Sequence, residues 1–188
     1  GEQQRVALAR ALAPKPQVLL MDEPFSNLDH RLRDQIRQNT IEILKQTGTT
    51  TVIVTHDPEE ALQIADQIIL MHQGEIIQIG TPKALYRQPA TLFAARYFSA
   101  LNEIPAQRVA QQLQTCFGAH PISEALVQHQ EPIRCCFRPH QVQVFSQPTA
   151  GAIPATVLSS SFMGHAEQLR LQLDPENIIL AQVSPAHT

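Results

Sequence analysis

Hydrophobic positions in the first half of the chain follow two periods, one typical of helices and one typical of buried strands. Apolar residues recur at helical spacing in residues 2–13 and 30–46, where one face carries Leu32, Ile36, Ile43 and Leu44. Between these segments lies the apolar run 18–21, and the β-branched run 50–55 follows. The pattern predicts alternating helices and strands around a parallel sheet, in which the strand 18–21 is covered on both faces.

The same pattern gives finer expectations for the helices and for a hairpin. The first helix is expected to bury its face Val6, Ala9, Leu12 and Ala13. A further helix starts at Asp57-Pro58, with Asp57 as the N-cap and the acidic residues Glu59 and Glu60 also serving the cap. Residues 67–72 and 75–80 read as a β-hairpin that closes this domain near residue 100.

The last third of the chain changes character, with short strand candidates separated by Pro, Gly and Asn turns. These candidates are Ile133–Phe137, Val142–Phe145, Ala155–Ser159, Ala166–Leu173 and Ile178–Val183. We therefore predict a small all-β barrel over residues 133–188, after an α/β portion over residues 1–100. Residues 101–132 are either a linker or the first strands of the second domain.

Composition is ordinary for a globular chain, with 43% hydrophobic and 16% charged residues and no apolar run long enough to cross a bilayer. A formal net charge of −3 without a basic block argues against a nucleic-acid partner. Three cysteines, two of them adjacent at 135 and 136, do not make a disulfide framework, and burial in a strand is favoured over a metal site.

The candidate chemistry lies where the apolar run 18–21 ends. Asp22 and Glu23 follow this run directly, and functional groups of parallel sheets lie beyond the carboxyl ends of the strands. One carboxylate there can hold Mg²⁺ while the next orients or deprotonates an attacking water. The alternative for an isolated pair is two solvated acids at a strand end.

Two flanking elements decide between these readings. Gly1-Glu2-Gln3 opens a helix before the strand, and His56 closes the next strand 33 residues after Glu23. In this order the segments resemble the signature motif, Walker B strand, D-loop and switch histidine of the ATP-binding subunits of ABC transporters. The resemblance covers residues 1 to about 100.

The resemblance implies a role for each matching residue. Asp22 would hold Mg²⁺, Glu23 would be the catalytic base or water-orienting group, and His56 would sense the γ-phosphate of ATP. The D-loop across a homodimer would be formed by Ser26, Asn27, Leu28 and Asp29. The helix end at Gly1, Glu2 and Gln3 would cap ATP held by the opposite subunit, because helix N-termini bind anions.

Later residues narrow the resemblance to importers. Residues 81–98 resemble ATPases of binding-protein-dependent uptake, and Arg138-Pro139 resembles an element of their oligosaccharide-binding-like accessory (TOBE) domain. His140 stands where that element has an acid, and Arg138 is expected at the surface in a salt bridge. Asn-Glu-Ile-Pro at 102–105 resembles the iron(III) branch. The implied partners are transmembrane permease subunits and, indirectly, a periplasmic solute-binding protein, at the cytoplasmic face of the inner membrane.

One expected motif does not occur in the 188 residues, namely the phosphate-binding loop Gly-x-x-x-x-Gly-Lys-Ser/Thr. We therefore expect a C-terminal fragment that starts within the signature motif and does not hydrolyse ATP alone. Two alternatives stay open: a non-catalytic regulatory or dimerisation fragment, and a soluble ABC ATPase of translation or DNA repair.

Overall fold

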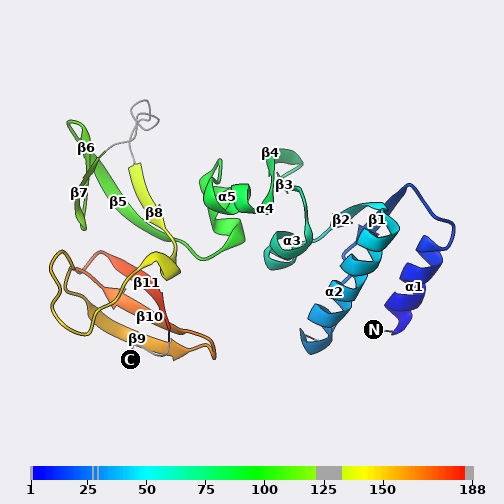
Figure 1. The fold of residues 1–188 in the computed structure, drawn as a ribbon. Helices are drawn as coiled ribbons and strands as arrows, with labels where there is room; N and C mark the ends of the chain where they lie inside the picture. The colour runs from blue at the N-terminus through cyan, green and yellow to red at the C-terminus, as the bar shows by residue number, and fades with distance from the viewer. Residues whose placement is uncertain (1, 27, 29, 122–132, 185–188) are drawn as a thin grey trace. The chain divides into compact units, whose positions relative to one another are not determined.

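The computed structural model describes residues 2–26, 28, 30–121 and 133–184, with the backbone only at 2–4 and 30–32. The chain divides into two compact units, residues 1–98 and 99–188 (Figure 1), and each is described here by itself.

Unit 1 alternates helices with short strands, as the sequence pattern predicts. Its elements are α1 (Glu2–Leu12), β1 (Val18–Asp22), α2 (His30–Thr47), β2 (Thr50–Val54), α3 (Pro58–Ile64), β3 (Ile68–His72), β4 (Glu75–Gly80), α4 (Pro82–Arg87) and α5 (Leu92–Phe98). Strands β1 and β2 are parallel and pair from Val18↔Thr50 to Asp22↔Val54. Strands β3 and β4 form the predicted antiparallel hairpin.

The expectation that β1 is covered on both faces is wrong for the described residues. Leu19 is 8% exposed, but Val18 and Leu20 on the opposite face are 53% and 73% exposed. Their neighbours Val52 and Val54 on β2 are exposed too. A continuous apolar run fits a strand buried on both faces, but it cannot say which face this chain itself covers.

The inner face of α1 also differs from the expectation. Val6 is 59% exposed, and Ala9 and Ala13 are exposed as well. Instead Ala7, Leu8 and Ala11 line a cavity below β1. Helical periodicity fails here because the segment is rich in alanine, so several faces are almost equally apolar.

Two small cores hold the rest of unit 1 together. In the first core, Phe25 and Leu28 of the loop after β1 pack against Ile36 of α2. The second core joins the β3–β4 hairpin to α4 and α5 through Ile68, Leu70, Leu85, Ala94 and Phe98. These cores fix the helices that surround the loop between β2 and α3.

Unit 2 consists of two antiparallel sheets. The first has the order β7-β6-β5-β8, and the second has the order β11-β10-β9. The strands are β5 (Asn102–Val109), β6 (Gln112–Thr115), β7 (Gly118–Pro121), β8 (Ile133–Phe137), β9 (Thr156–Phe162), β10 (Glu167–Gln172) and β11 (Ile178–Val183). In the segment 101–132, which the pattern left ambiguous, the described residues 101–121 are therefore mostly strand, and residues 122–132 lie outside the described residues. Both sheets are small and open, so closure into a barrel stays a prediction.

Two local expectations in unit 2 are wrong. Residues 142–145 form no strand but follow the short 3₁₀ turn η2 (Pro139–Gln141). Arg138, expected at the surface, is 6% exposed, and its backbone N–H donates to Gln141 Oε1 at 2.7 Å. The turn η2 lies against β11, which removes Arg138 from solvent.

The two sheets of unit 2 are joined by a buried amide. Asn102 on β5 is 5% exposed, its Nδ2 donates to the Leu180 carbonyl at 2.7 Å, and its Oδ1 accepts from the Leu180 N–H at 2.7 Å. Around it pack Ile104, Leu169, Leu171, Ile179 and Ala181. Asn102 thus satisfies both backbone groups of one residue in the opposite sheet.

Replacing this amide should destabilise unit 2. In Asn102→Ala the N–H and carbonyl of Leu180 lose their partners, which costs about 2–4 kcal/mol of unfolding free energy. Urea unfolding of the chain measures this loss. Gln107→Ala, at an exposed position of the same strand, should change stability by less than about 0.5 kcal/mol. Equal effects of the two substitutions would contradict the structural role of Asn102.

Candidate functional site

The site begins where β1 ends. The Glu23 N–H donates to the Val54 carbonyl at 2.8 Å, which extends the pairing of β1 with β2 by one residue. Glu23 then adopts φ +44°, in the left-handed region that costs a non-glycine residue about 1–2 kcal/mol. Such strain persists only where surrounding contacts impose it, and it is common at functional sites. Here the backbone turns sharply at Glu23.

The turn places Glu23 against the histidine of the next strand end. Glu23 Oε1 lies 2.9 Å from His56 Nδ1, although the two residues are 33 positions apart. The Ser26 hydroxyl donates to the Glu23 carbonyl at 3.0 Å and fixes the same turn. Both members of the pair are accessible, with side chains 46% exposed for Glu23 and 74% for His56. A carboxylate and an imidazole that touch and reach solvent can together orient a substrate or a water.

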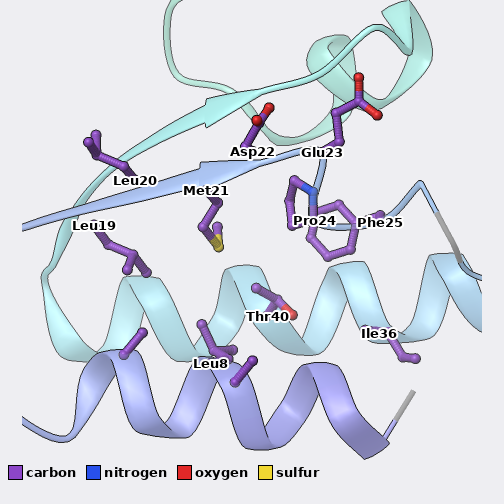
Figure 2. A pocket seen from close by; sticks show the side chains of 12 residues that line it. Leu8, Leu19, Leu20, Met21, Asp22, Glu23, Pro24, Phe25, Ile36 and Thr40 are labelled. Atoms are coloured by element: carbon purple, nitrogen blue, oxygen red, sulfur yellow. The ribbon is translucent and has the colours of Figure 1, made fainter.

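Asp22 lies beside this pair but on the exposed face of the sheet. Figure 2 shows the side chains of Leu20 and Asp22 on the opposite side of β1 from those of Leu19 and Met21. Leu19 and Met21 point into a cavity of about 370 Å³ that is lined mainly by apolar residues, and its lining also includes Leu20, Asp22 and Glu23. The Asp22 side chain points away from the apolar side of this cavity, toward the exposed face of β1.

The described residues hold no group of three His, Cys, Asp or Glu side chains that could bind a metal ion on its own. Mg²⁺ does not need such a group when a nucleotide is present, because it is commonly bound by one or two carboxylates, substrate phosphates and water. Asp22 on the exposed face fits that donor set as a single carboxylate.

The other expected site residues differ in how far the structure describes them. Gly1, Asn27 and Asp29 lie outside the described residues, and Glu2 and Gln3 are described only as backbone at the start of α1. Leu28 is 8% exposed and packs against Phe25 and Ile36. The geometry thus brings Glu23, Ser26 and His56 together, with Asp22 adjacent in sequence.

Sequence reasoning missed the buried carboxyl of Glu60. Glu60 occupies the position of a capping-box acid, yet it is 4% exposed and accepts a hydrogen bond from Thr55 Oγ1 at 2.9 Å. The reason is that Thr55 takes over the expected function, since its Oγ1 accepts from the Asp57 N–H at 3.0 Å. Asp57 itself is the predicted cap, because its Oδ1 accepts from the N–H groups of Glu59 and Glu60 at 2.9 and 3.2 Å.

A second, smaller cavity of about 50 Å³ lies among these groups. Its lining includes Glu23, Ser26, Arg33, His56 and Glu60. Burial raises the pKa of the Glu60 carboxyl above its ordinary value of 4.5, and the negative charge of Asp57 raises the pKa further. The hydrogen bond from Thr55 and the positive charges of Arg37 and Arg33 lower the pKa, but they do not cancel the effect of burial. No periodicity or motif indicated the clustering of Arg33 and Glu60 around the pair.

The raised pKa of Glu60 predicts a pH-dependent stability. The protonated carboxyl stabilises the fold at low pH, and this contribution is lost as the pH rises above 4.5 through the higher pKa of the folded state. Glu60→Gln removes the titration, so its stability relative to the wild type should increase from pH 5 to pH 8 in urea unfolding. Glu59→Gln, at an exposed position, serves as the control. A pH-independent difference between Glu60→Gln and the wild type would contradict the burial of a titrating carboxyl.

Curated proteins similar to the chain are ATP-binding subunits of importers. The chain is 41% identical over 191 residues to the sulfate/thiosulfate import ATP-binding protein CysA 2 of Chromobacterium violaceum, a match over 99% of this chain and 52% of that protein. It is 37% identical to the Fe(3+) ions import ATP-binding protein FbpC of Haemophilus influenzae, over 98% and 54% of the two chains. It is 33% identical to the putrescine transport ATP-binding protein PotG of Escherichia coli, over 100% and 52%.

Two further comparisons are less extensive. A family described as "AAA domain, putative AbiEii toxin, Type IV TA system" matches residues 3–62. A solved structure titled "An inward-facing conformation of a putative metal-chelate type ABC transporter" matches 67% of this chain and 48% of its own, at 26% identity and a TM-score of 0.44, which is too partial a likeness to bear on the fold. No helix among the described residues has the length and apolarity needed to span a membrane.

The chain spans about half the length of the curated relatives it matches, and that match runs across nearly all of its own residues. The relatives transport different solutes but share one function in their names, the binding of ATP. By these matches the chain is a homologue of the ATP-binding subunits of ABC transporters.

Proposed function

We propose that this chain supplies the hydrolytic end of the ATP site in the ATPase subunit of an ABC importer. The observation that carries the proposal is the contact of 2.9 Å between Glu23 Oε1 and His56 Nδ1 at the carboxyl ends of two parallel strands. Ligands of open α/β sheets bind at that edge. The similarity to importer subunits for sulfate, Fe(3+) and putrescine supports the same function.

In this proposal each residue acts on the γ-phosphate end of ATP. The Glu23 carboxylate accepts a hydrogen bond from the attacking water and orients it, or takes its proton. His56 hydrogen-bonds Glu23 and would exchange that contact for one to a terminal phosphate oxygen when ATP binds. Asp22 would hold Mg²⁺, which supplies charge neutralisation on the phosphates when bound.

The phosphate cradle is proposed to come from outside the 188 residues, since the chain carries no Gly-x-x-x-x-Gly-Lys-Ser/Thr sequence. The exposed face of Leu20, Val52 and Val54 supports this, because parallel sheets are normally covered on both faces. On this proposal the chain alone does not hydrolyse ATP.

The proposed assembly follows the resemblance. Ser26, Asn27 and Asp29 would face a second ATPase subunit, while the Leu28 side chain holds this segment to the core, and Gly1, Glu2 and Gln3 would approach the nucleotide of that subunit. Residues 1–100 would be nucleotide-binding and residues 133–188 a TOBE-type accessory domain. The subunit would contact permease subunits at the cytoplasmic face of the membrane, and through them a solute-binding protein.

The proposal is tested in a hybrid ATPase, defined as the Chromobacterium violaceum relative with its matched segment replaced by this chain. Glu23→Gln should lower ATP turnover by about 10²–10⁴-fold, because the general base is lost, while ATP binding persists. Phosphate release and equilibrium ATP binding measure the two effects. Glu59→Gln, an exposed acid of α3, should leave turnover unchanged. Turnover of Glu23→Gln near the wild-type rate would refute the proposed role of Glu23.

For the transported solute we propose iron(III), on the Asn-Glu-Ile-Pro sequence at residues 102–105 and the similarity to Fe(3+) import subunits. The hybrid ATPase should restore iron-limited growth to a bacterium that lacks its iron(III) import ATPase. A strain lacking its sulfate import ATPase is the parallel sample. Restoration of growth on sulfate but not on iron would refute iron(III) as the solute.

A further inference from the structure

The position of His56 depends on the backbone that carries it. The His56 side chain is 74% exposed, so side-chain packing does little to hold the imidazole against Glu23. We define the His56 loop as residues 55–57, between β2 and α3. Two side chains from other helices, Tyr97 of α5 and Arg33 of α2, reach this loop.

Tyr97 contacts the backbone of His56 itself. Its hydroxyl donates a hydrogen bond to the His56 carbonyl at 3.3 Å, across 41 residues of sequence. The ring is half-buried and packs on two others of the same helix, with centroid distances of 5.9 Å to Phe93 and 5.3 Å to Phe98. Burial and the nearby charge of Asp57 raise the pKa of the Tyr97 phenol, so it keeps its proton and remains a donor at physiological pH.

Arg33 joins the His56 loop to the loop that follows Glu23. Its Nη2 donates to the Leu28 carbonyl at 3.2 Å, and its Nη1 lies 3.8 Å from Asp57 Oδ2. The side chains of Arg33 and Asp57 are 29% and 31% exposed, so the ion pair is partly shielded from solvent. Asp57 cannot follow Arg33 freely, because its other oxygen caps α3. A displacement of the Leu28 backbone therefore reaches the residue next to His56.

We propose that Tyr97 and Arg33 are positioning residues that hold the His56 loop so that the imidazole meets Glu23. This inference rests on the proposed function, because it gives the two residues an effect on hydrolysis only through His56. Tyr97 anchors the loop to the core that joins the β3–β4 hairpin to α4 and α5. Arg33 connects it to Leu28, in the segment proposed to face a second subunit, so that contacts made there change the approach of His56 to Glu23.

Kinetics of the hybrid ATPase separate positioning from general stabilisation. Tyr97→Phe removes only the hydroxyl and should lower kcat about three- to tenfold. Arg33→Gln should lower it about tenfold or more, because a charged donor is lost. Neither substitution should change the KM for ATP as strongly as it changes kcat, and neither should lower the Tm substantially. The matched control is Tyr86→Phe, the same change at the other tyrosine of the chain, on α4, which should leave kcat unchanged.

The decisive comparison is made in a His56→Ala background. If Tyr97 and Arg33 act through the imidazole, Tyr97→Phe and Arg33→Gln should have no further effect on kcat once His56 is absent. An undiminished effect in that background would overturn the inference while leaving the proposed function intact. If His56→Ala itself left kcat unchanged, the proposed role of His56 would fail instead.

A measurement without turnover completes the test. Hydrogen exchange of the Asp57 amide, which donates to Thr55 Oγ1, reports the opening of the His56 loop in the 188-residue chain. Tyr97→Phe and Arg33→Gln should each accelerate this exchange severalfold, and Tyr86→Phe should not. Unchanged exchange in both variants would overturn the positioning role whatever the hybrid ATPase does.

Discussion

The site depends on the parallel pairing of β1 with β2. Their register runs to Asp22↔Val54, and the Glu23 N–H then donates to the Val54 carbonyl. Both strands therefore end at the same edge, so the residue after β1 lies beside the loop after β2. A slip of one residue would turn Asp22 to the opposite face of the sheet and would separate Glu23 from His56. The contact of 2.9 Å between these side chains thus follows from strand register.

Local chemistry then turns this register into a defined site. The left-handed conformation of Glu23 and the hydrogen bond from Ser26 set the direction of one carboxylate. On the other side, Thr55 Oγ1 accepts a hydrogen bond from the Asp57 N–H, and Asp57 caps α3. The buried Glu60 carboxyl accepts a hydrogen bond from the Thr55 hydroxyl. The buried and half-buried groups beneath Glu23 and His56 hold these two side chains in place while both stay accessible. Such an arrangement leaves Glu23 and His56 open to a substrate while the scaffold beneath them stays ordered.

Much of this could be predicted from the sequence, because the relevant signals are local. The helix and strand periods, the Asp57 cap and the β3–β4 hairpin each depend on residues close together in the chain, and all are present. Glu23 and His56 were predicted at the ends of two successive strands, but the direct contact between their side chains was not predicted. The outcomes that differed depend on tertiary packing. The inner face of α1 could not be predicted because the helix is rich in alanine. Glu60 has the position of a capping acid, but Thr55 Oγ1 accepts the hydrogen bond from the Asp57 N–H in its place.

Unit 2 shows the same division. The predicted strand Ala166–Leu173 is present as β10, with Leu169 and Leu171 buried, and the turn at Asp174 is held by hydrogen bonds from the backbone of Glu176 and Asn177. Strands β5 to β7 were ambiguous because the glutamine-rich segment lacks a clear alternation, and they form through pairing of β5 with β8 and β6, and of β6 with β7. The link between the sheets through Asn102 and Leu180 joins residues 78 positions apart. No local pattern could indicate it.

We propose that Asp22, Glu23 and His56 surround the γ-phosphate of ATP. A crystal structure of the Glu23→Gln hybrid ATPase with Mg²⁺ and ATP tests this arrangement. We expect Mg²⁺ to be held by Asp22, directly or through one of its waters, and the γ-phosphate to lie between residue 23 and the imidazole of His56. ATP bound with its γ-phosphate remote from both Asp22 and His56 would show that these residues do not form the hydrolytic site.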